Sequence, residues 1–173
     1  MLQWRWKPGL PKTKKPIFEQ NISFWTIPRT NRELLCDVWQ PPDGVERSGL
    51  AFVYLHGGAW YFLDKDFGTR PMFEQLTAQG HVVMDVSYRL MPEVDIYGMV
   101  GDVKRAVAWM KDNAGRYGVN PDRIVLGGGS SGGHLALLAA YAPDDPRLTP
   151  QDLESKPGIV WGVGRQQGQV ASG

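Results

Sequence analysis

Four short apolar runs along the chain predict β-strands. The runs at 50–55, 81–86 and 123–126 are largely continuous rather than alternating, and continuous apolarity favours strands that are covered on both faces, as in a parallel sheet. An earlier run at 32–39 ends in the turn sequence Pro-Pro-Asp-Gly at 41–44, which favours a strand closed by a tight turn.

Helical patterns lie between and after these runs. Residues 69–79 precede a glycine, and apolar positions from Met99 to Met110 recur at the spacing of an amphipathic helix, which places Asp102 and Lys104 largely on its polar side. Residues 135–140 are apolar on every side, so we expect a buried helix there. Strands that alternate with helices in this way predict an α/β fold, with a parallel central sheet flanked by helices.

The composition fits a single globular domain and does not indicate a nucleic-acid partner. The chain has 173 residues and a formal net charge of +1, which gives no electrostatic footprint for nucleic acid. The single cysteine, Cys36, fits a reducing, cytoplasmic setting and a small buried hydrophobe better than a nucleophile. We expect a basic arm over 1–31, a partial hydrolase domain over 32–163 and a frayed tail over 164–173.

The predicted arm has an unusual beginning. Its first sixteen residues carry five basic side chains and no acid, interleaved with Trp4 and Trp6. Basic charge combined with tryptophan can hold a segment weakly at an anionic membrane surface. A solvated arm that packs loosely on the domain is the simpler interpretation, and we favour it while leaving peripheral membrane contact open.

The chemistry centres on a strand-to-helix corner. Residues 128–132 (GGSSG) fit the pattern G-x-S-x-G between a predicted strand and a predicted helix, where this motif presents a nucleophilic serine. Ser130 is therefore the candidate catalytic residue. Flanking glycines let the strand and helix approach closely, and the helix N-terminus favours developing negative charge.

A second motif strengthens the evidence that Ser130 is a catalytic nucleophile. Residues 56–60 (HGGAW) follow an earlier buried strand, the position of a loop that donates backbone amides to a tetrahedral oxyanion. The predicted donors of this oxyanion hole are Gly57, Gly58, Ala59 and Ser131, and the predicted lining of the substrate pocket is His56, Trp60 and Tyr61.

Three segments together resemble the hormone-sensitive-lipase-like carboxylesterases: 56–60 (HGGAW), 88–93 (YRLMPE) and 128–136 (GGSSGGHLA). The resemblance runs from about Arg32 to about Val163. It implies an α/β-hydrolase fold, no metal and no organic cofactor, and hydrolysis of small-molecule esters with short or medium acyl chains. Ala59 stands where the family commonly has a third glycine, but its N–H remains available.

A serine hydrolase of this fold needs an acid and then a histidine after the nucleophile. The 43 residues that follow Ser130 include His134 but no later histidine, and His134 lies only one helical turn from the serine. The resemblance places the base after a later strand. We therefore expect an N-terminal portion without its C-terminal strands, unstable or weakly active alone.

Other functions fit parts of the pattern. Gly127, Gly129 and Gly132 match the dinucleotide fingerprint G-x-G-x-x-G, but that fingerprint belongs after the first strand, with an acid ending the next. A non-catalytic protein of the same fold that binds a small ligand, as plant gibberellin receptors do, is the main alternative. A peptidase of the same fold is a third.

Overall fold

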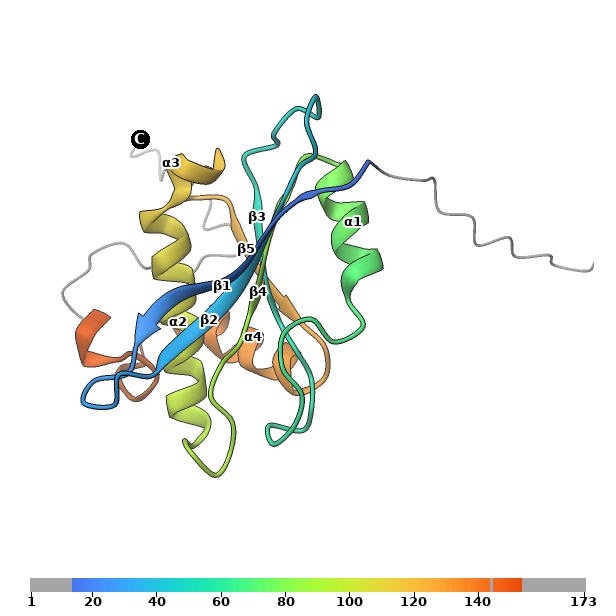
Figure 1. The fold of residues 1–173 in the computed structure, drawn as a ribbon. Helices are drawn as coiled ribbons and strands as arrows, with labels where there is room; N and C mark the ends of the chain where they lie inside the picture. The colour runs from blue at the N-terminus through green and yellow to red at the C-terminus, as the bar shows by residue number, and fades with distance from the viewer. Residues whose placement is uncertain (1–13, 144, 154–173) are drawn as a thin grey trace, which may run out of the picture.

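The computed structural model describes residues 14–143 and 145–153, and it contains one five-stranded sheet (Figure 1). The strand order is β1-β2-β4-β3-β5. The strands are β1 (Ile17–Thr26), β2 (Glu33–Gln40), β3 (Ala51–Leu55), β4 (Val82–Val86) and β5 (Ile124–Gly128). The α/β prediction is confirmed, and each predicted strand lies within two residues of its observed bounds.

The sheet is mixed rather than wholly parallel, which corrects one expectation. β4, β3 and β5 are parallel, whereas β2 is antiparallel to both of its neighbours, β1 and β4. Only the three continuous apolar runs form the parallel part. β1 and β2 are joined by the short turn 27–32, and a connection of that length allows only an antiparallel pair.

Helices cover both faces of the sheet (Figure 1). On one face α1 packs through Phe73 against Trp39 and Val83. The larger hydrophobic core lies on the other face and includes Val53 from the sheet and Leu135 from a helix. The helices are α1 (Arg70–Ala78), α2 (Ile96–Asp112), α3 (Ala114–Tyr117) and α4 (Ser131–Tyr141), followed by the short 3-10 turns η1 (Pro146–Leu148) and η2 (Gln151–Leu153).

The first strand lies inside the segment that we expected to be an arm. β1 pairs with β2 from Ile17 opposite Gln40 to Thr26 opposite Glu33, with two irregularities in register. The sheet therefore starts well before Arg32. These irregularities interrupt the two-residue alternation that identifies a strand in a sequence. Residues 1–13, which hold both tryptophans of the predicted membrane contact, lie outside the described residues.

Helix α2 buries two charged side chains that its spacing assigned to a polar side. Asp102 and Lys104 are almost wholly buried. The Lys104 ammonium donates to the carbonyl of Pro143 and to the hydroxyl of Thr149. Polar side chains are tolerated in such a position because hydrogen bonds replace the lost water. The polar-face expectation fails for these two residues because α4 and η1 also pack against α2.

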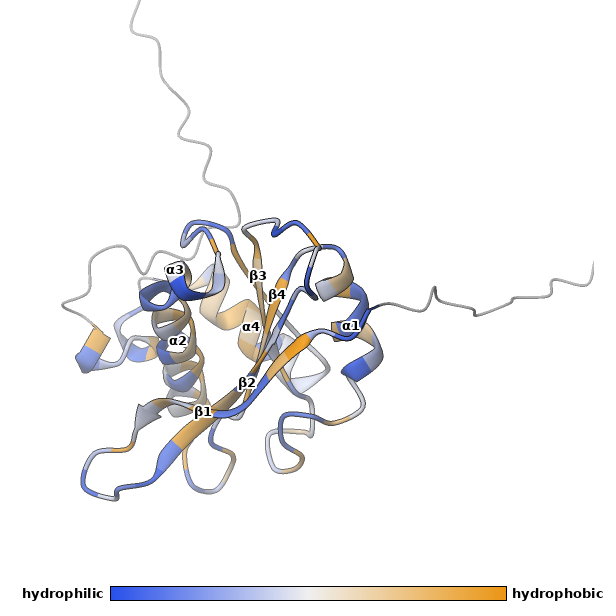
Figure 2. Cartoon of the chain, turned by 45° about the horizontal axis from the view of Figure 1, so that its top comes forward, coloured by the Kyte–Doolittle hydropathy of each residue, from blue (hydrophilic) through white to orange (hydrophobic). Residues whose placement is uncertain are grey.

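Residues 135–140 of helix α4 are hydrophobic, as the sequence indicates (Figure 2). The helix is nevertheless buried on one side only. Leu135 and Ala139 are buried, whereas Leu137 is 57% exposed and Tyr141 is 72% exposed. β5, which α4 follows, is the last strand of the described sheet. Consequently no element in the described part of the chain covers the far side of α4. Within 14–143 and 145–153, no helix has the length and apolarity to cross a membrane.

Candidate functional site

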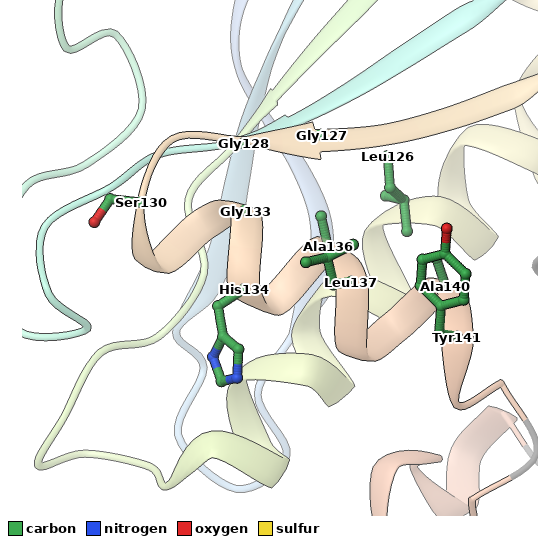
Figure 3. A pocket seen from close by; sticks show the side chains of 10 residues that line it. All are labelled: Leu126, Gly127, Gly128, Ser130, Gly133, His134, Ala136, Leu137, Ala140 and Tyr141. Carbon is green, nitrogen blue, oxygen red and sulfur yellow. The ribbon is translucent and has the colours of Figure 1, made fainter.

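Ser130 lies at the corner between β5 and α4 with a backbone that few residues adopt (Figure 3). Its φ is 49° and its ψ is −118°, and the residue is exposed. A positive φ is costly for a residue with a side chain and is retained where the surroundings enforce it. The strand-to-helix corner expected from the sequence is therefore present, with the serine on its outside.

Two glycines make this corner sterically possible. A Cβ atom on Gly128 would lie 2.5 Å from the carbonyl oxygen of Leu55, and one on Gly132 would lie 2.1 Å from the same oxygen. Both distances are far below van der Waals contact, so only glycine fits. The close approach seats the start of α4 directly against the end of β3.

The loop after β3 meets the serine at the same edge of the sheet. β3 and β5 are parallel, with Leu55 opposite Gly128, so the segments that follow both strands leave the sheet side by side. A Cβ atom on Gly57 would lie 3.1 Å from the Gly129 carbonyl oxygen and 3.5 Å from the Ser130 Cβ. The two sequence motifs, 56–60 and 128–132, are thus in contact although they lie far apart in the chain.

The side chain of His56 orients the loop from beneath. Its Nδ1 lies 2.7 Å from the carbonyl oxygen of Gly57. Since a carbonyl only accepts, Nδ1 carries the proton. Burial lowers the pKa of His56, which favours the neutral ring. In a trans peptide the C=O and the following N–H point in opposite directions, so holding the Gly57 carbonyl turns the Gly58 N–H away from His56.

The rest of the loop is tightly turned. Gly58 has a φ of 122°, and a Cβ atom there would overlap the Phe62 carbonyl. Its own carbonyl accepts hydrogen bonds from the amides of Tyr61 and Phe62. Ala59 adopts a φ of 51°, a left-handed conformation in which glycine is the more usual residue. The alanine that departs from the resembled family is therefore accommodated with its N–H in place.

Tyr88 supports the loop, a role that the sequence did not reveal. Its hydroxyl donates to the His56 carbonyl oxygen at 2.7 Å, and its ring stacks on the His56 ring with centroids 4.4 Å apart. The next residue, Arg89, forms a bidentate pair with buried Asp102 on α2, at 2.8 and 2.7 Å. The motif 88–93 marked this segment, but nothing in the pattern named the partners of its side chains.

Family comparison identifies the chain at this point. The family model BD-FAE matches residues 36–158, which include both loops of the site. The chain belongs to the BD-FAE family. In Mycobacterium tuberculosis, the esterase LipQ is 37% identical over 120 residues, and the probable carboxylic ester hydrolase LipM is 38% identical over 132 residues.

Solved structures agree with the fold of this BD-FAE chain. The apo form of Thermogutta terrifontis esterase 2 superposes with a TM-score of 0.66 at 28% identity, over 82% of this chain and 51% of that one. The expected α/β-hydrolase fold of carboxylesterases is confirmed. The sequence matches cover 69% and 75% of this chain but only 28% of LipQ and 30% of LipM. The chain therefore spans about half of the solved esterase and about a third or less of these two relatives.

The BD-FAE chain places its three histidines in different surroundings. His81 faces Ser48, with its Nδ1 2.7 Å from the Ser48 hydroxyl oxygen. His134 extends from α4 away from the Ser130 hydroxyl (Figure 3) and meets the edge of Trp60. Within the described ranges, no histidine is hydrogen-bonded to Ser130. The described residues thus include the predicted nucleophile and the predicted amide donors, but no base in contact with the serine.

An open hollow of about 600 Å³ lies beside the nucleophile (Figure 3). It is lined by the end of β5 and the uncovered side of α4, including Ser130, Leu137 and Tyr141, and its size suits a small organic ligand. The predicted pocket residues lie elsewhere: His56 is buried beneath the loop, Trp60 packs on His134, and Tyr61 is 51% exposed. The pocket role of Trp60 and Tyr61 stays a prediction.

Proposed function

We propose that this chain carries the nucleophile and the oxyanion hole of a carboxylic ester hydrolase. Ser130 attacks the carbonyl carbon of an ester, and the tetrahedral oxyanion is bound by the backbone amides of Gly57, Gly58 and Ser131, with Ala59 extending the set. The alcohol leaves, an acyl-serine remains, and water then releases the acid. The base and its orienting acid come from outside the described residues, in the order typical of the fold.

The contact between Gly57 and the nucleophile corner carries this proposal. It brings the loop that carries the proposed amide donors next to the Ser130 side chain, and acyl transfer requires both groups near one carbonyl. Membership of the BD-FAE family and likeness to named esterases support the same reaction. Short or medium acyl chains remain the expected substrates, by the resemblance noted in the sequence.

Turnover of a short-chain nitrophenyl ester tests the proposal. Ser130→Ala should abolish ester cleavage, because the hydroxyl of the adjacent Ser131 is buried. Ser23→Ala, a substitution on β1 far from the site, serves as the matched control and should leave turnover unchanged. Measurable turnover by the parent protein that is unchanged in Ser130→Ala would refute the assignment. Stabilisation by a small ligand, without any Ser130-dependent turnover, would instead support a binding protein of the same fold.

A further inference from the structure

Two buried aspartates face each other on the side of the sheet that α1 covers. Asp37 lies on β2 and Asp85 lies opposite it on β4. Their exposed fractions are 0% and 1%. Directly opposed residues on antiparallel strands have Cβ atoms roughly 5 Å apart, so their carboxylates reach the same space. Neither residue belongs to the nucleophile corner or the oxyanion loop.

In each carboxylate, one oxygen accepts hydrogen bonds and the other has no hydrogen-bond partner among the described residues. Asp37 Oδ1 accepts a hydrogen bond from the Lys65 ammonium at 2.9 Å and another from the backbone amide of Asn21 at 2.8 Å. Asp85 Oδ2 accepts from the Asp66 amide at 2.7 Å. The remaining oxygens, Asp37 Oδ2 and Asp85 Oδ1, are buried with no hydrogen-bond partner among the described residues. A buried, unpaired carboxylate oxygen is strongly unfavourable.

The charges around the pair do not balance when both aspartates are ionised. The loop between β3 and α1 presents one ammonium, Lys65, and also the carboxylate of Asp66. β3 presents the Tyr54 phenol, opposite Asp85. α1 contributes apolar Phe73 and the buried hydroxyl of its cap Thr69, while its Arg70 guanidinium stands over Trp39. β1 contributes the Asn21 amide.

The proton affinity of Asp85 reflects this imbalance. Burial raises the pKa of Asp85 to about 7, the Asp66 amide opposes that rise, and the charge of Asp37 adds to it. Two carboxylates in one site with a single proton between them are a known arrangement, because like charges this close resist joint ionisation. A proton between Asp37 Oδ2 and Asp85 Oδ1 would satisfy both atoms at once.

We propose that Asp37 and Asp85 share one proton between Asp37 Oδ2 and Asp85 Oδ1. In this state the pair holds the segment 59–69, which continues from the oxyanion loop, against the sheet. The proton is taken from solvent, and no other bond changes. Lys65 and Asp66 attach the loop to the two carboxylates. Loss of the proton leaves two buried negative charges, and the loop then opens to let water reach them. This hydration outweighs the stronger hydrogen bond that an ionised Asp85 accepts from the Asp66 amide.

The pair also reaches the nucleophile side of the site. Asp85 raises the pKa of Tyr54, second to burial, and the Tyr54 hydroxyl oxygen lies 3.1 Å from the position of a Cβ on Gly129. In this proposal Asp37 and Asp85 are positioning residues for the loop, and Tyr54, opposite Asp85 on β3, lies between the pair and the corner. This catalytic consequence rests on the proposed function, whereas the shared proton does not.

The sign of the pH effect follows from the raised pKa. Asp85 binds its proton more tightly in the folded chain than in the unfolded one, so its contribution to stability is full in acid and is lost as pH rises through about 7. Asp85→Asn keeps this position neutral and supplies an amide donor for Asp37. Compared with Asp85→Asn, the parent chain should lose several degrees of Tm between about pH 5.5 and about pH 8.5.

Asp43→Asn is the matched control, since it removes an exposed carboxylate in the turn after β2. Its Tm should follow the parent chain at every pH. Parallel curves for the parent chain and Asp85→Asn would overturn the proposal. If Asp85→Asn fails to fold, the parent chain with ¹³C-labelled aspartate carboxyls decides: one aspartate should titrate near neutral pH, and titration of every aspartate in the ordinary acid range would overturn the proposal.

Hydrogen exchange locates the effect in the molecule. After correction for the intrinsic pH dependence of exchange, the amides of residues 59–69 should exchange several-fold faster at about pH 8.5 than at about pH 5.5 in the parent chain, and at equal corrected rates in Asp85→Asn. Equal corrected rates in the parent chain would overturn the loop attachment. None of these measurements involves ester cleavage, so their failure is distinguishable from failure of the proposed function.

Discussion

The residues that determine the site mostly act on backbone groups rather than on a substrate. His56 holds the carbonyl of Gly57, and Tyr88 holds the carbonyl of His56. Ser130 is held at a positive φ by the close packing around it. A preorganised set of amides stabilises a developing oxyanion without reorganising during the reaction, so side chains one layer beneath the loop matter as much as the nucleophile.

The Tyr88 hydroxyl provides a test at this scale. Tyr88→Phe keeps the stacked ring but leaves the buried carbonyl of His56 without its donor. We expect a loss of about 1–3 kcal/mol in the free energy of unfolding, measured by urea denaturation. Tyr141→Phe, at a side chain that is 72% exposed, should cost almost nothing. Equal stabilities of the two variants would contradict the role assigned to Tyr88.

The sequence alone predicted those site residues that belong to a local motif. Ser130 and Gly57 were predicted because the glycine patterns around them are short and continuous. Tyr88 and Asp102 carried no such signal, because the first acts on a carbonyl 32 positions away and the second pairs with an arginine 13 positions away. Side-chain partners across a fold follow from its packing, which no local pattern encodes.

Among the elements, the parallel pair β3 and β5 creates the site. β3 and β5 end at the same level of the sheet, so the segments that follow both strands lie at one edge. The start of α4 packs directly on the end of β3 because Gly128 and Gly132 have no side chains. The helical and strand patterns predicted these elements well. They predicted the second side of α2 poorly, since a single amphipathic pattern identifies one buried face and cannot show that α4 and η1 also pack against this helix.

Two glycine substitutions test the close packing of α4 on β3. Gly132→Ala forces a methyl group to 2.1 Å from the Leu55 carbonyl oxygen, and we expect a cost on the order of 3 kcal/mol or failure to fold. Gly115→Ala, where nothing lies within 4 Å of the new methyl, should be neutral or slightly stabilising, since alanine favours a helix over glycine. Thermal unfolding of both variants measures this difference, and a tolerated Gly132→Ala would contradict it.

The two sides of α4 should respond differently to substitution. Leu135→Ala removes a wholly buried side chain and should cost about 2–5 kcal/mol. Leu137→Gln changes a side chain that is 57% exposed, and its cost should stay within about 0.5 kcal/mol. Denaturant titration of both variants provides the comparison. A large loss in Leu137→Gln would show that something covers this side in solution.

In the described part of the chain, the sheet has an open edge beside the corner that carries Ser130. β5 ends the strand order, with Val125 43% exposed, and the hollow next to Ser130 continues along the same side. Unpaired strand edges with apolar side chains promote association between chains. The relatives of this chain are considerably longer. In Thermogutta terrifontis esterase 2, about half of the chain has no counterpart in the matched region.

Association through this edge can be measured on the chain itself. We expect concentration-dependent self-association in size-exclusion chromatography, and Val125→Lys should reduce it because a charge on an edge strand opposes pairing. Lys111→Arg on α2, which keeps the charge, is the control and should associate like the parent. A parent chain that stays monomeric at all concentrations would contradict this expectation.

The account depends most on the presentation of one hydroxyl to the amides of the neighbouring loop, and mass mapping of a covalent adduct tests that most directly. Thermogutta terrifontis esterase 2 has been solved phosphorylated by paraoxon, and the same reagent can be applied to this protein. We predict a diethylphosphoryl group on Ser130 and none on the adjacent Ser131, which is buried. An adduct on Ser131 in place of Ser130 would contradict the account.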